Sequence, residues 1–98
     1  MTIEKNLVNA ELTITLTGRL DTASAPLLEG ELKHSIGGVE NLIFDFAGIE
    51  YISSAGLRVL LQAQKVMNRQ GTMVVRNVNE MVSEVFEITG FADILTIE

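Results

Sequence analysis

The feature that most constrains the fold of this chain is the order in which strand-like and helix-like patterns follow one another. Residues 11–17 alternate strictly between polar and apolar side chains, which is typical of a strand with one buried face. A predicted strand at 2–8 precedes it, and Asn9-Ala10 suits a tight hairpin between the two. Helix-like and strand-like segments then alternate, in the order helix 24–36, strand 41–46, helix 54–70, strand 72–76, helix 80–89 and strand 94–97. This order predicts an α/β fold with one mixed sheet of four to five strands, an opening hairpin and mainly right-handed helical crossovers.

Local signals predict where these elements begin, end and face the core. Ser24 and Asn79 are preferred N-cap residues, so we expect them to cap the first and third helices. The segment Gly18–Asp21 breaks the strand pattern, so the second strand is predicted to end before it. Strand 41–46 is almost continuously apolar, which indicates that both of its faces are covered. Apolar side chains at three- and four-residue steps predict the core-facing stripe of the third helix, namely Met81, Val82, Val85 and Ile88.

The composition narrows the classes of function. With 98 residues, of which 47% are apolar, the chain has the size of one domain, which we place at 1–98. It has no Cys and a single histidine, His34, so we expect neither a metal site nor a cofactor. A net charge of −6 disfavours nucleic acid and anionic membranes as partners and suits a partner with a basic patch. We recognise no signal peptide and no apolar run of membrane-spanning length, so we expect a cytoplasmic protein, most simply a monomer.

The segment Asp45–Leu57 stands out chemically because it brings two serine hydroxyls to the start of a strongly amphipathic helix. Serine is a common N-cap there, since its oxygen accepts an unpaired N–H of the first turn. A helix start also carries free N–H groups and about half a positive charge, so it accommodates an attached phosphate. Such a phosphate adds about −1.5 to −2 charges and three acceptor oxygens, which a bound partner would meet. The residues alone favour capping and leave a phosphorylation switch open.

The stretch Ile52–Leu61 resembles the signature of STAS-domain anti-sigma-factor antagonists. Aligning on Gly56-Leu57 places that family's phosphoserine on Ser54, with Ser53 as the second choice. The family often has Asp immediately before its phosphoserine, whereas this chain has Ser53, so we expect Ser53 to cap the helix while Ser54 faces a partner. Two further segments resemble family elements in the same order along the chain, Gly18–Asp21 and Gly90-Phe91.

The resemblance implies a regulatory binding protein and not an enzyme. The unphosphorylated form would bind an anti-sigma factor that is also a serine kinase of the GHKL type, and would thereby release the sigma factor for transcription. Phosphorylation of Ser54 would end this binding, and a serine phosphatase of the PPM type would restore it. The residues expected to contact the partner are Asp21, Ser53, Ser54, Gly56, Leu57 and Arg58.

Two other classes of function stay open. A STAS domain can also be a scaffolding subunit of a transport or signalling complex without phosphorylation, and the fold alone does not separate the two uses. A serine hydrolase that acts through Ser54 is the third alternative. It is disfavoured because His34, the single histidine, lies in another predicted helix and no Gly-x-Ser-x-Gly elbow surrounds the serine.

Overall fold

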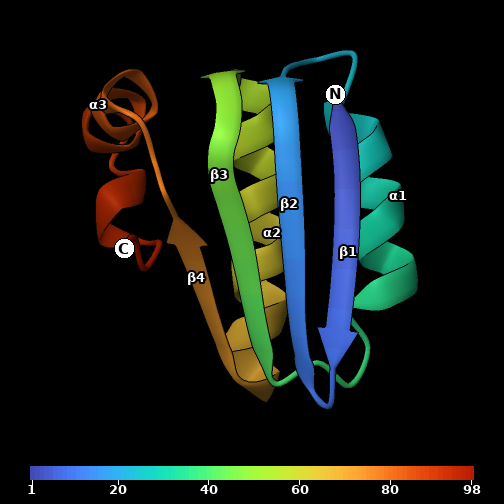
Figure 1. Cartoon of the computed structure of the whole chain (residues 1–98). Helices are drawn as coiled ribbons and strands as arrows, with labels where there is room; N and C mark the ends of the chain where they lie inside the picture. Colours follow the sequence, from blue (N-terminus) through green and yellow to red (C-terminus); the bar gives the residue numbers. More distant parts are fainter.

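The computed structural model describes all 98 residues as four strands and three helices, followed by a short 3₁₀ turn. In chain order the elements are β1 (Thr2–Val8), β2 (Glu11–Leu20), α1 (Ala25–Ser35), β3 (Asn41–Ile52), α2 (Ser54–Gln70), β4 (Thr72–Arg76), α3 (Glu80–Ile88) and the 3₁₀ turn Phe91–Asp93. The strands form one sheet in the order β1-β2-β3-β4, with β1 antiparallel to β2 and with β2, β3 and β4 parallel (Figure 1). The predicted mixed sheet with an opening hairpin and helical crossovers is confirmed.

The hairpin forms because its turn contains a residue that tolerates a left-handed backbone. Asn9 has a φ of 56°, a conformation that Asn adopts more readily than most residues. The short turn pairs Val8 with Glu11 and so sets the register of β1 against β2. This register places one set of alternating β2 side chains on the inner face, where they are buried: Leu12, Ile14, Leu16 and Leu20.

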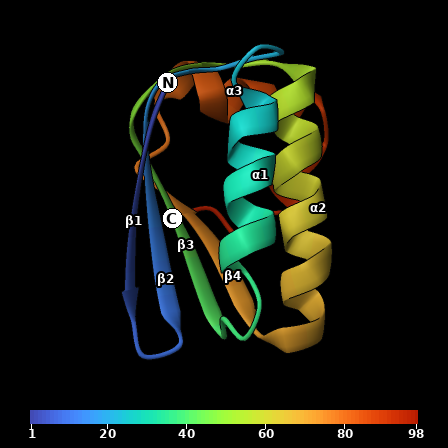
Figure 2. The same ribbon diagram turned by 90° about the vertical axis from the view of Figure 1, so that its right-hand side faces the viewer.

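Helices α1 and α2 lie side by side against the same face of the sheet (Figure 2). They share a face because each connects a strand to the next parallel strand in the same direction, and both crossovers are right-handed. The expectation that strand 41–46 is covered on both faces is therefore wrong. Ile43 points to the uncovered face and is still only 7% exposed, flanked by Thr13 and Val74 in the register of the neighbouring strands.

Three strand predictions differ from the structure. Strand β3, predicted over 41–46, continues to Ile52. Strand β2 continues through Gly18 to Leu20, because its parallel pairing with β3 resumes after a register shift and ends with Leu20 opposite Ile52. The predicted strand 94–97 does not form. The 3₁₀ turn Phe91–Asp93 occupies the chain just before it, and only Ile97 reaches the sheet, as a single parallel bridge to Val75 of β4.

Helix α3 faces the core with only part of the predicted stripe, namely Val82 and, in part, Val85. Val82 and Phe86 are buried, and the Phe86 ring lies 6.4 Å from that of Phe46, centroid to centroid. Met81 and Ile88, which we expected to face the core, are 50% and 84% exposed. The apolar repeat supports two adjacent stripes, and the Phe86 contact decides which one is buried. None of the helices combines the length and apolar character needed to cross a membrane.

Candidate functional site

The serine pair lies where β3 passes into α2. Ser53 has extended backbone angles, with φ −101° and ψ 175°, and its hydroxyl oxygen accepts a hydrogen bond of 3.5 Å from the Gly56 amide. Its own amide donates to the Leu20 carbonyl at 2.9 Å, which ties the helix start to the end of β2. Ser53 is therefore the N-cap of α2, and capping occupies its hydroxyl.

Ser54 is the first residue of α2 and its side chain is exposed. The first turn of this 17-residue helix contains no acidic residue, so no carboxylate of its own compensates the free amides there. Arg58, one turn further along, is exposed as well. The site thus consists of an accessible hydroxyl at the positive end of a long helix, an arrangement that can accommodate an anion.

Gly56 allows α2 to begin this close to the sheet. A Cβ atom at this position would lie 2.7 Å from the Leu20 Cγ, 2.9 Å from the Ile52 Cγ1 and 3.0 Å from the Leu20 carbonyl oxygen. Leu57 follows it into the core and is only 5% exposed. These two residues, predicted as partner contacts, are buried. Their place in the structure is to hold Ser54 in position.

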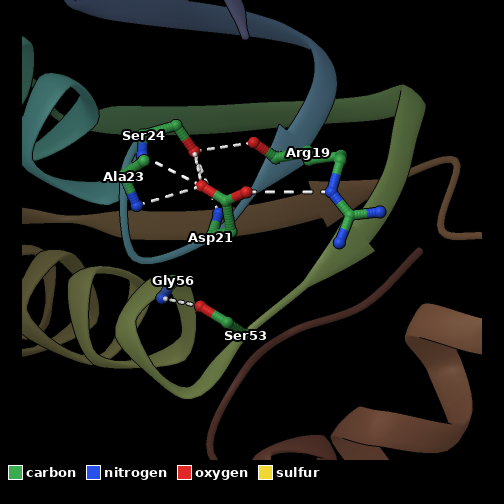
Figure 3. A network of polar contacts seen from close by, with 6 residues as sticks. All are labelled: Arg19, Asp21, Ala23, Ser24, Ser53 and Gly56. Atoms are coloured by element: carbon green, nitrogen blue, oxygen red, sulfur yellow. Dashed lines mark hydrogen bonds and ion pairs between the residues drawn. The ribbon is translucent and has the colours of Figure 1, made fainter.

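The turn between β2 and α1 lies next to the start of α2, because Leu20, which binds the Ser53 amide, directly precedes Asp21 (Figure 3). The Asp21 Oδ1 accepts hydrogen bonds from the amides of Ala23 and Ser24, both at 3.1 Å. These bonds, foremost the one from the Ser24 amide, hold the pKa of the Asp21 carboxyl below its ordinary value. Asp21 is therefore a fixed, ionised group at the rim of the site.

Ser24 organises this turn and does not cap α1, so the predicted cap is wrong. Its hydroxyl donates to the Arg19 carbonyl at 2.6 Å and accepts from the Asp21 amide at 2.9 Å. Ser24 has helical backbone angles and is only 7% exposed, so its side chain points back into the turn and away from the free amides of α1. The prediction for Asn79 is confirmed: its side chain accepts from the Val82 amide at 2.8 Å.

Arg19 also belongs to the site, although nothing in the sequence indicated its role. Its guanidinium carbon lies 4.4 Å from the centroid of the Tyr51 ring, and its Nε lies 3.7 Å from the Asp21 Oδ2. The contact with Tyr51 depends on the parallel pairing of Arg19 with Tyr51, which joins β2 to β3. No local pattern signals this pairing, because the two residues are brought together by the sheet.

The single histidine is remote from the serine pair, since His34 is exposed in the last turn of α1, near the end of the molecule opposite the start of α2 (Figure 2). No three His, Asp or Glu side chains gather as metal ligands.

Comparison with known proteins agrees with the fold. The sequence model of the STAS domain family matches residues 2–98. The chain is 36% identical over 99 residues to BtrV of Bordetella bronchiseptica, whose name places it among anti-sigma factor antagonists, with 99% of this chain and 85% of BtrV covered. It is 28% identical over 88 residues to the anti-sigma-B factor antagonist of Bacillus subtilis, with 89% of this chain and 81% of that protein covered.

The fold is shared with the Bacillus anti-sigma factor antagonist SpoIIAA, which has been solved in two forms. The unphosphorylated form matches with a TM-score of 0.79 at 19% identity, covering 99% of this chain and 87% of SpoIIAA. The phosphorylated form matches with a TM-score of 0.77 at 19% identity, covering 99% and 91%. The match over residues 2–98 and the identity to BtrV together show that the chain belongs to the STAS domain family of anti-sigma factor antagonists.

Proposed function

We propose that this protein binds an anti-sigma factor and that phosphate on Ser54 switches the binding off. The observation that carries the proposal is the position of Ser54: exposed, at the first position of a 17-residue helix, beside a serine that already caps it. The names of two relatives, which are anti-sigma factor antagonists, support the partner class. The existence of SpoIIAA in phosphorylated and unphosphorylated forms supports the type of switch.

Phosphorylation needs only an accessible hydroxyl from this chain. The Ser54 oxygen attacks the γ-phosphorus of ATP, an O–P bond forms, the bond to the bridging oxygen breaks, and ADP leaves. The hydroxyl proton passes to a base of the kinase. We propose that the anti-sigma factor is itself this serine kinase, of the GHKL type, and that a phosphatase of the PPM type removes the phosphate by hydrolysis.

The start of α2 can carry the phosphate without refolding. The helix end supplies about half a positive charge and free amides, whereas the phosphate brings about −1.5 to −2 charges. The Ser53 cap and the burial of Leu57 keep this end of the helix in place in both states. A partner pressed against Ser54 must instead desolvate the new charge. An unpaired charge in an interface typically costs about 2–5 kcal/mol, enough to dissociate a micromolar complex.

The partner surface that we propose consists of the exposed groups around the helix start. Ser54 lies at its centre, Arg58 lies one turn along α2, and the fixed Asp21 carboxylate lies across from them on the neighbouring turn. Gly56 and Leu57 act through the position they impose on Ser54. The surface carries groups of both signs, since Arg19 lies beside Asp21 and Arg58 follows Ser54 on α2, so a partner of complementary charge docks in a preferred orientation.

The test uses the anti-sigma factor of the same organism, with MgATP. Mass spectrometry should map one phosphate to Ser54, and Ser54→Ala should take up none. The matched control is Ser53→Ala. This variant should still be phosphorylated on Ser54, because the Ser53 hydroxyl that it lacks serves as the helix cap. Calorimetry should then show that the phosphorylated protein has lost affinity for the anti-sigma factor, while Ser54→Ala binds before and after exposure to ATP. Phosphate on Ser54→Ala, or undiminished binding of the phosphoprotein, would refute the proposal.

A further inference from the structure

Helix α3 presents an apolar stripe that the domain covers only on its inner side, where Val85 packs against the core. Met81 and Ile88 are 50% and 84% exposed, and Val85, between them, is partly buried. Their spacing of four and three residues places the three on one side of the helix. Val82 and Phe86 point into the core from the adjacent side. The stripe is therefore available to a partner.

Acidic side chains accompany this stripe. Glu80, Glu84 and Glu87 are exposed, and none of them belongs to the ion pairs of the domain. Glu84 lies three residues after Met81 and four before Ile88, so it is on the same side of α3 as both. Residues 77–98 contain five acids and no basic residue, and the preceding Arg76 pairs with Glu98 at 3.0 Å and not with these glutamates.

The acidity is a local property and not a general one. The preceding residues 1–76 carry eight acids against seven Lys or Arg, so that part of the chain is nearly neutral. Almost the whole net charge of −6 therefore belongs to α3 and the residues that follow it. The negative electrostatic potential around α3 attracts a cationic partner and repels anionic ones.

We infer that this α3 surface, defined by Met81, Glu84, Val85, Glu87 and Ile88, docks a basic amphipathic helix of a partner protein. The apolar side of that helix covers the stripe, and its lysines or arginines lie beside the glutamates. A second copy of this chain is a poor occupant, because α3 against α3 brings glutamates together. Anionic lipid and nucleic acid are repelled for the same reason.

This surface is separate from the serine site and goes beyond the proposed function. Helix α3 lies beyond β4, at the edge of the sheet opposite α1 and β1 (Figure 1). No residue of the surface takes part in the Ser53 cap or the Asp21 turn. The protein can therefore hold a second partner, or a second part of the same one, independently of phosphorylation.

The test uses a designed amphipathic helical peptide with leucines on one face and lysines on its flanks, carrying a fluorescent label. Its affinity for the intact domain is measured by anisotropy, and the contact is mapped by NMR shifts of the ¹⁵N-labelled protein. The same peptide with glutamate for each lysine is the control ligand. Ile88→Ser is compared with Leu27→Ser, a change at a residue of α1 that is 59% exposed. Glu84→Lys/Glu87→Lys is compared with Glu4→Lys/Glu11→Lys, which alters net charge equally at exposed positions of β1 and β2.

We expect shifts confined to α3, no binding of the glutamate peptide, and affinity lowered about fivefold or more by each α3 variant. The two matched controls should retain most of the affinity, and added salt should weaken binding of the lysine peptide. Three results each overturn the inference: no binding of the lysine peptide, shifts that map away from α3, or equal losses in the α3 variants and their controls. Circular dichroism of every variant establishes that the fold is retained, which the exposure of the substituted residues favours.

Discussion

Replacing Gly56 by alanine tests the idea that a missing side chain sets the position of the serine site. The added methyl group would lie 2.7 Å from the Leu20 Cγ and 3.0 Å from the Leu20 carbonyl oxygen. Leu20 is fully buried, and its carbonyl also binds the Ser53 amide at 2.9 Å, so neither atom can move away without loss. Overpacking of this kind costs about 1–3 kcal/mol. The helix propensity of alanine returns at most about 1 kcal/mol, so we expect a net loss of up to about 2 kcal/mol.

Gly30→Ala is the matched control, because it makes the same chemical change inside α1. A Cβ at Gly30 meets no atom within 4 Å, so the substitution keeps the gain in helix propensity and adds no clash. We expect it to raise the free energy of unfolding by about 0.5–1 kcal/mol. The two variants should therefore shift stability in opposite directions, and their difference isolates the packing cost at the start of α2.

The assay is urea unfolding followed by circular dichroism, supported by thermal midpoints. For a domain of this size, 1 kcal/mol corresponds to about 4–8 °C in Tm. A Gly56→Ala protein as stable as Gly30→Ala would refute the packing argument, because it would mean that the helix start moves freely. The same movement should also displace Ser54, so we expect slower phosphorylation of Gly56→Ala by its kinase.

Three further predictions concern polar contacts that stabilise the fold. Ser24→Ala should lower the free energy of unfolding by about 1–3 kcal/mol, because it leaves two part-buried backbone groups, the Arg19 carbonyl and the Asp21 amide, without a partner; urea unfolding measures this. Asn79→Ala should lower the free energy of unfolding by about 1–2 kcal/mol, and by more than Ser53→Ala does, because the capping hydrogen bond is 2.8 Å long at Asn79 and 3.5 Å long at Ser53. Equal losses in urea unfolding would contradict this ranking. The pKa of the Asp45 carboxyl is lowered, first by the hydrogen bond from the Asn77 side chain. Asp45 should therefore stabilise the fold above its unfolded pKa of about 3.9, and this stability should be lost as the pH falls through the lower folded pKa. Asn77→Ala should make the urea midpoint depend less on pH between about pH 5 and pH 2, and an unchanged dependence would contradict the assignment.

The candidate site was predictable from the sequence as a location and only in part as a set of contacts. Two serines before an amphipathic helix marked the position, and the cap at Ser53 with an exposed Ser54 agrees with the expectation. Gly56 and Leu57, which the family resemblance placed among the partner contacts, are buried, because a motif does not say which of its members face a partner. The Arg19 contact with Tyr51 was missed because it depends on two strands meeting in register.

The sequence by itself determined which elements form, and in what order, from β1 through α3. The alternation of residues 11–17, the Asn9 turn and the helical repeats are local properties, since each depends on neighbours a few positions away. Only the tertiary structure decided that the sheet is covered on one face and that α3 leaves Ile88 in water. These outcomes depend on the direction of the crossovers and on the packing of Phe86, which are contacts between segments distant along the chain.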